Sequence, residues 1–125
     1  MAKTVMVVDD SETDLLLTRL TLEGAGIAGR LLLMRSAEEA LACLARPGQA
    51  VDLVLLDVNM PGLDGFDFLA RFGQLVPVPA PVVMLSASPD PADRQRALAH
   101  ACVQDFLSKP LDPAKAAGLR AHLGP

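Results

Sequence analysis

The sequence has few aromatic side chains, no excess of positive charge and no long apolar run. Its 125 residues include four Phe and neither Tyr nor Trp, which leaves few flat rings for stacking against nucleic-acid bases. The net charge is -4 and the Lys and Arg residues are scattered, whereas a protein that fills a nucleic-acid groove needs a basic face. No apolar stretch approaches the ~18 residues of a membrane helix, and the apolar run near the N-terminus is too short for a signal peptide. We therefore expect a cytoplasmic protein that contacts neither nucleic acid nor a membrane directly.

Cysteine is also scarce. Cys43 and Cys102 lie far apart, with no neighbouring pattern of metal ligands, so we expect two reduced thiols that are buried or half-buried. Hydrophobic residues make up 51% of the chain and charged residues 21%, a balance that argues against disorder. The length suits one domain with one core.

Short, continuous apolar runs alternate with segments of helical length. Such runs are typical of parallel strands that are covered on both faces, since an exposed face would require alternating polar residues. The runs occupy residues 5–8, 31–34, 53–56, 82–85 and 106–107. Strands that alternate with helices predict right-handed crossovers with helices on both faces of the sheet, which is an α/β fold.

Capping signals mark the starts of the predicted helices. Ser36 and Glu39 have the spacing of a capping box, in which each side chain caps the other residue's backbone N–H. Asp90 and Asp112 each precede a proline, the combination of an N-cap residue with Pro at the first helical position. The five helices are predicted to begin near Ser11, Ser36, Gly65, Asp90 and Asp112.

Two of these helices carry further signals. The first places Leu16, Leu17 and Leu20 on one side at helical spacing. The last contains Gly118, which destabilises a helix interior by about 1 kcal/mol relative to Ala.

Polar residues follow four of the five predicted strands. Asp9 and Asp10 follow the first strand, Asp57 the third, Ser86 the fourth and Lys109 the fifth. Each alone has a plain structural explanation as a helix cap, a turn residue or a solvated side chain. Together they favour a site, because ligands of an open parallel sheet bind outside the carboxyl ends of the strands.

The chemistry of this group points to a metal and a phosphoryl group. Three carboxylates in one cleft raise each other's pKa unless a cation joins them, and oxygen ligands of this kind suit Mg²⁺. With a phosphoryl group present, Lys109 would offset its charge and the Ser86 hydroxyl would donate a hydrogen bond to it. A carboxylate can also act as the nucleophile and form an aspartyl phosphate.

Four motifs resemble those of the receiver domains of response regulators. They are the pair Asp9-Asp10, the segment LLDVNMPGLDG at 55–65, the tripeptide LSA at 85–87 and the segment DFLSKP at 105–110. The resemblance covers almost the whole chain, and the central motif is highly specific. It implies that residues 1–125 form a single receiver domain with a flavodoxin-like (βα)5 fold. That fold is a doubly wound parallel sheet with strand order 2-1-3-4-5.

The resemblance also implies a role for each acidic residue. Asp57 would accept a phosphoryl group from a sensor histidine kinase, a histidine phosphotransfer protein or a small donor such as acetyl phosphate. Mg²⁺, or Mn²⁺ in its place, would be held by Asp10, Asp57 and the backbone carbonyl of Asn59, with Asp9 acting through water.

The remaining motif residues would stabilise the phosphoryl group and transmit its presence. By the same resemblance, Ser86, the backbone N–H of Ala87 and Lys109 contact the phosphoryl oxygens. Ser86 and Phe106 are the switch residues, with the ring turning inward after phosphorylation. The Lys109–Pro110 peptide bond is expected to be cis.

Several hypotheses about function follow from these residues. The resemblance implies a phosphorylation-dependent switch that is a monomer or a weak dimer. An unknown output partner would bind the face formed by its fourth helix, fifth strand and fifth helix. The switch would catalyse only its own phosphorylation and dephosphorylation. One alternative is a phosphate-independent interaction adaptor with the same fold; another is a receiver part of a longer regulator or hybrid kinase. A haloacid-dehalogenase-like phosphotransferase is disfavoured, because it needs a second Asp where this chain has Asn59.

Overall fold

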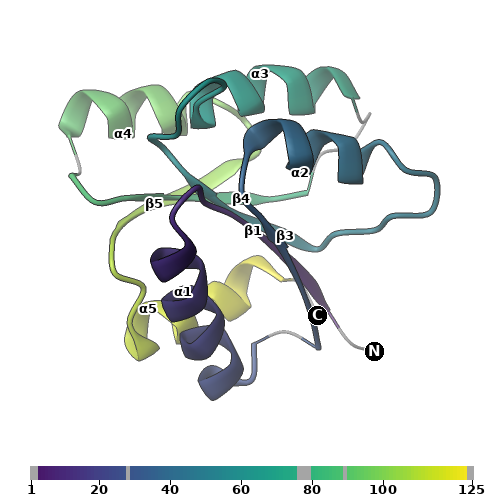
Figure 1. The fold of residues 1–125 in the computed structure, drawn as a ribbon. Helices are drawn as coiled ribbons and strands as arrows, with labels where there is room; N and C mark the ends of the chain where they lie inside the picture. Colours follow the sequence, from purple (N-terminus) through teal and green to yellow (C-terminus); the bar gives the residue numbers. More distant parts are fainter. Residues whose placement is uncertain (1–2, 28, 76–79, 89, 124–125) are drawn as a thin grey trace.

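The fold is a single parallel sheet with helices on both faces (Figure 1). The computed structural model describes residues 3–27, 29–75, 80–88 and 90–123. All strand pairs are parallel, and the order is β2-β1-β3-β4-β5. The strands are β1 (Thr4–Val8), β2 (Arg30–Met34), β3 (Leu53–Asp57), β4 (Val82–Ser86) and β5 (Val103–Ser108). The predicted flavodoxin-like α/β fold and its strand order are therefore confirmed.

Two helices cover one face of the sheet and three cover the other. In Figure 1, α1 and α5 lie below the sheet, whereas α2, α3 and α4 lie above it. None of the helices in the described part of the chain is both long enough and apolar enough to cross a membrane. The helices are α1 (Glu12–Ala25), α2 (Ala37–Leu44), α3 (Gly65–Leu75), α4 (Pro91–Leu98) and α5 (Pro113–Gly118), and α5 continues as a 3-10 turn (Leu119–His122).

The predicted capping residues begin four of the helices. The side chains of Ser11, Ser36, Asp90 and Asp112 each accept a hydrogen bond from a backbone N–H two or three residues further on. A cap of this kind stabilises a helix by about 1 kcal/mol. Gly118 ends the last α-helix, so the glycine predicted to weaken this helix lies at its C-terminus.

The central strands are buried on both faces. Val54 and Leu56 of β3 pack in the core beneath α2, α3 and α4, while Leu53 and Leu55 pack in the second core against α1 and α5. All four side chains are fully buried, and each stabilises the fold by about 1.5–3 kcal/mol relative to exposure. This two-sided burial explains why the strands are continuously apolar and holds the carboxyl end of β3 in a fixed place.

The buried side of α1 differs from the side that carries the three predicted leucines. Leu16, Leu17 and Leu20 do share one side, but they are 46%, 48% and 52% exposed. Leu15, Thr18 and Leu22 form the buried side, because residues three and seven positions apart lie on the same side of a helix. The orientation of α1 is thus set by packing against the second core.

Candidate functional site

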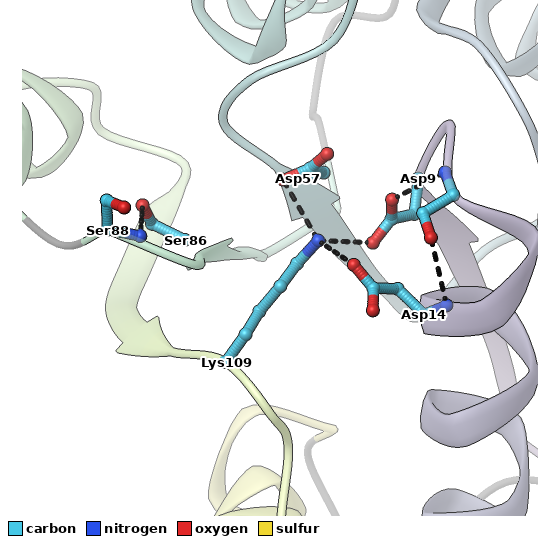
Figure 2. Close-up of polar contacts among 7 residues, drawn as sticks. Asp9, Asp14, Asp57, Ser86, Ser88 and Lys109 are labelled. Atoms are coloured by element: carbon cyan, nitrogen blue, oxygen red, sulfur yellow. Dashed lines mark hydrogen bonds and ion pairs between the residues drawn. The ribbon is translucent and has the colours of Figure 1, made fainter.

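The strand ends bring four predicted site residues to one edge of the sheet (Figure 2). Asp9 follows β1, Asp57 is the last residue of β3, and Ser86 is the last residue of β4. Lys109 follows β5, and its backbone N–H donates to the carbonyl oxygen of Ser86 at 2.8 Å. The Lys109–Pro110 peptide bond is cis. The parallel topology alone therefore gathers side chains that are far apart in the sequence.

The ammonium group of Lys109 lies among three carboxylates (Figure 2). Its Nζ is 2.6 Å from Asp9 Oδ2, 3.0 Å from Asp14 Oδ2 and 3.2 Å from Asp57 Oδ1. Burial alone would lower the pKa of Lys109, but hydrogen bonds to Asp9 and Asp14 and the nearby negative charges raise it above its ordinary value. The side chain is therefore a fixed positive charge at the centre of the site.

Asp57 is the acid most affected by its surroundings. Its side chain is buried, and burial, followed by the negative charge of Asp9, raises the pKa of Asp57 to about 7, against the opposing effect of Lys109. Lys109 also pairs with two other carboxylates, so its single charge cannot offset them all. The site thus has excess negative charge around Asp57 that a further cation would relieve.

Three of the predicted metal ligands are close enough to share one ion. One carboxylate oxygen from each of Asp9, Asp10 and Asp57 lies within 4.8 Å of the others. Asp10 is exposed and faces solvent, and Asn59, whose backbone carbonyl is the fourth predicted ligand, is also exposed. Carboxylate and carbonyl oxygens are the ligands of Mg²⁺ and Mn²⁺. The donor set therefore fits the expected ion.

The loop after Asp57 is held in place by backbone contacts. The Val58 N–H donates to the carbonyl oxygen of Leu85 at 3.1 Å, and the Gly65 N–H donates to that of Val58 at 3.0 Å. A Cβ atom on Gly65 would lie 2.6 Å from the carbonyl oxygen of Asp57. Only glycine allows α3 to begin this close to the backbone of Asp57.

The two predicted switch residues are buried on neighbouring strands. The Ser86 hydroxyl is fully buried and accepts a hydrogen bond from the Ser88 N–H at 3.2 Å (Figure 2). Phe106 is only 4% exposed and packs in the core beneath α2, α3 and α4. The carbonyl oxygen of Phe106 accepts a hydrogen bond from Arg94 of α4 at 2.9 Å. Ala87 lies exposed directly after β4.

Asp14 is part of this site but was not predicted from the sequence. Its position in the first turn of α1, three residues after Ser11, is typical of an acid in a capping box. Nothing in the local pattern distinguishes such a cap from an acid that reaches the fifth strand. The remaining signal, an acidic residue one turn after Asp9 and Asp10, becomes visible only once the position of Lys109 is known.

Comparison with known proteins supports one family. The model of the response regulator receiver domain matches residues 5–118. The two-component response regulator ORR1 of Oryza sativa subsp. japonica is 33% identical over 114 residues, which cover 86% of this chain. They cover 49% of ORR1, so the chain spans about half the length of that relative.

Solved structures of the same kind share the fold. A two-component response regulator from Cytophaga hutchinsonii superposes with a TM-score of 0.88 and 25% identity, covering 98% of this chain and 96% of the other. The Mn²⁺-bound form of response regulator Rcp1 has a TM-score of 0.77 and 27% identity, covering 95% and 92%. With the matching motifs, sheet order and strand-end residues, these similarities place the chain in the family of response regulator receiver domains.

Proposed function

We propose that this receiver domain is a phosphorylation-dependent switch in which Asp57 accepts the phosphoryl group. The observation that carries the proposal is the contact between Lys109 Nζ and Asp57 Oδ1, at 3.2 Å, in a site that is otherwise acidic. A sensor histidine kinase or a histidine phosphotransfer protein would be the donor, as the family membership suggests. The protein would catalyse only its own phosphorylation and dephosphorylation.

The proposed transfer uses groups of this chain at stated atoms. A carboxylate oxygen of Asp57 attacks phosphorus, the bond between phosphorus and the donor nitrogen breaks, and the imidazole leaves with the electron pair. Lys109 offsets the negative charge of the phosphoryl oxygens, and the Ser86 hydroxyl and the Ala87 N–H donate hydrogen bonds to them.

A divalent cation would complete the charge balance. Asp10, Asp57 and the carbonyl of Asn59 would hold Mg²⁺ or Mn²⁺, with Asp9 acting through water. The related response regulator Rcp1 has been solved in a Mn²⁺-bound form. Such an ion supplies positive charge that brings the phosphoryl donor and the carboxylates together. The excess negative charge around Asp57 supports this assignment.

The signal would leave the site through β4 and β5. Ser86 ends β4, and Phe106 lies on β5 beside Met84 in the strand register. The hydrogen bond from Arg94 to the carbonyl of Phe106 connects this strand to α4. We therefore propose that phosphorylation alters the face formed by α4, β5 and α5, and that an output partner binds there. The protein itself would be a monomer or a weak dimer. The cytoplasmic location stays a prediction.

Transfer of radiolabel from acetyl phosphate tests the proposed chemistry. Wild-type protein with Mg²⁺ should take up label, while wild-type protein with EDTA and the Asp57→Asn variant should not. An Asp67→Asn variant changes an exposed acid in the first turn of α3, and it should be labelled like the wild type. Equal labelling of Asp57→Asn and wild type would refute the proposal.

One observation favours a second candidate, a phosphate-independent adaptor. The Phe106 side chain is buried in this structure, and the family resemblance implies an inward-turned ring in the phosphorylated state. Once an output partner is found, its affinity for the wild type can be measured with and without acetyl phosphate and Mg²⁺, with Asp57→Asn as the control that is not phosphorylated. Binding that phosphorylation leaves unchanged would favour the adaptor over the switch.

A further inference from the structure

The side chain of Asp14 crosses from α1 to the ammonium group of Lys109 (Figure 2). Its Oδ2 accepts a hydrogen bond from Lys109 Nζ at 3.0 Å, between residues 95 positions apart in the sequence. The Asp14 side chain is 38% exposed, whereas that of Lys109 is 12% exposed. The contact therefore lies at the edge of the site, where the ammonium group meets solvent.

The capping arrangement leaves the Asp14 carboxylate free for this contact. In a capping box the acid three residues after the N-cap residue accepts a hydrogen bond from the N-cap N–H. Here the Ser11 N–H donates to Asp9 Oδ1 at 3.0 Å instead. Ser11 still caps the helix, because its Oγ accepts from the Asp14 N–H at 3.2 Å. The carboxylate of Asp14 thus has Lys109 as its partner rather than the helix end.

The arrangement of carboxylates around Lys109 Nζ restricts how the ammonium group can be oriented. An ammonium group has three N–H donors, and three carboxylates surround this one. Asp9 and Asp14 both extend from the β1–α1 side, while Asp57 lies at the end of β3. Asp9 and Asp14 accept two of these donors, which leaves one donor for a further acceptor; Asp57 Oδ1 lies 3.2 Å from Nζ as an ion-pair partner. Asp14 is also the one of these three acids outside the predicted metal-ligand group.

We propose that Asp14 is a positioning residue that, together with Asp9, holds the Lys109 ammonium so that its third N–H points at a phosphoryl group on Asp57. This inference rests on the proposed function. A phosphoryl group on Asp57 would replace the present Asp57–Lys109 contact without requiring Lys109 to release Asp14. The positioning is therefore compatible with both the unmodified and the phosphorylated protein.

The first test observes the ammonium group in protein treated with EDTA. The sequence has only two other lysines, Lys3 and Lys115, so the Lys109 ammonium can be assigned in a proton–nitrogen spectrum at low temperature. In Asp14→Ala its signal should weaken, because the group exchanges protons faster once a hydrogen bond is lost. In Glu12→Gln, which removes another acid from the first turn of α1, the signal should stay as in the wild type.

The second test measures phosphoryl uptake over a range of acetyl phosphate concentrations with Mg²⁺. Asp14→Ala should lower the maximal rate about three- to tenfold, as expected for a charge-assisted hydrogen bond at a partly exposed site, and leave the half-saturating concentration unchanged. Asp14→Asn keeps an oxygen acceptor at the same position and should recover most of the rate. Glu12→Gln should match the wild type.

The two tests separate the inference from the function on which it rests. If the wild type takes up no phosphoryl group, the proposed function fails, while the ammonium spectrum still shows whether Asp14 fixes Lys109. If the wild type is phosphorylated but Asp14→Ala equals it in rate and in ammonium signal, Asp14 has no positioning role. Faster uptake in both Asp14 variants would mean that Asp14 competes for Lys109, and this would also overturn the inference.

Discussion

Replacing Asp57 with Asn should stabilise the metal-free protein at pH 8. The surroundings of Asp57 raise its pKa from 3.8 to about 7, chiefly through burial and the negative charge of Asp9. The folded state therefore binds a proton on this carboxyl more tightly than the unfolded state does. Stability from this group is fully present below pH 3.8, is lost as the pH rises toward 7, and changes little above that value.

The size of the expected stabilisation by Asp57→Asn follows from the raised pKa of Asp57. Each pKa unit corresponds to about 1.4 kcal/mol. Relative to low pH, titration of this carboxyl therefore reduces the free energy of unfolding by about 2 kcal/mol at pH 5, where only the unfolded state is ionised, and by up to about 4 kcal/mol at pH 8. Asn is neutral at both pH values and avoids this cost. The advantage of Asp57→Asn should therefore widen by roughly 2–3 kcal/mol between pH 5 and pH 8.

Urea unfolding of both proteins in EDTA at several pH values measures this difference. The comparison cancels the titration of other groups, since both proteins share them. The control Asp67→Asn changes an acid whose side chain caps the start of α3, and its offset from the wild type should not widen over this pH range. A constant difference between wild type and Asp57→Asn, or a variant less stable at pH 8, would refute the assigned charge balance.

Three further changes test other parts of the site. Asp10→Asn should weaken Mg²⁺ binding, so Mg²⁺ should raise its melting temperature less than that of the wild type. Mg²⁺ at 100 times its dissociation constant should increase the stability of the wild type by about 2.7 kcal/mol. Equal increases in melting temperature for both proteins would exclude Asp10 as a ligand. Gly65→Ala places a Cβ 2.6 Å from the Asp57 carbonyl and should destabilise by about 1–3 kcal/mol in urea unfolding. Gly73→Ala, with nothing within 4 Å, is its matched control and should be neutral or stabilising. Ser86→Ala should still be phosphorylated, but amide shifts caused by beryllofluoride and Mg²⁺ should spread less toward α4 and β5; an unchanged spread would remove Ser86 from the switch.

The fold and the centre of the site could be predicted because they depend on patterns that are local in the sequence. Continuous apolar runs indicated the buried parallel strands, and parallel strands place their carboxyl ends at one edge. Asp9, Asp57 and Lys109 were therefore expected at one edge, while the strand order that sets how close they lie came from the family resemblance. Their mutual contacts, at 2.6 and 3.2 Å to Lys109 Nζ, agree with that expectation.

Other features could not be predicted, since they depend on how packed elements are oriented. Which leucines of α1 are buried depends on the rotation of the helix against the second core, and Leu15 rather than Leu16 is buried. The Asp14–Lys109 contact joins residues from α1 and the end of β5, and only tertiary structure brings them together.

The most direct test of the central claim is to locate the phosphoryl group chemically. Protein treated with acetyl phosphate and Mg²⁺ is quenched with hydroxylamine, which converts an acyl phosphate to a hydroxamate, and peptides are mapped by mass spectrometry. The account predicts a hydroxamate on Asp57 alone, and none in Asp57→Asn. A stable phosphoryl group on Ser86 or on a histidine, or a hydroxamate on Asp9 or Asp10, would contradict it.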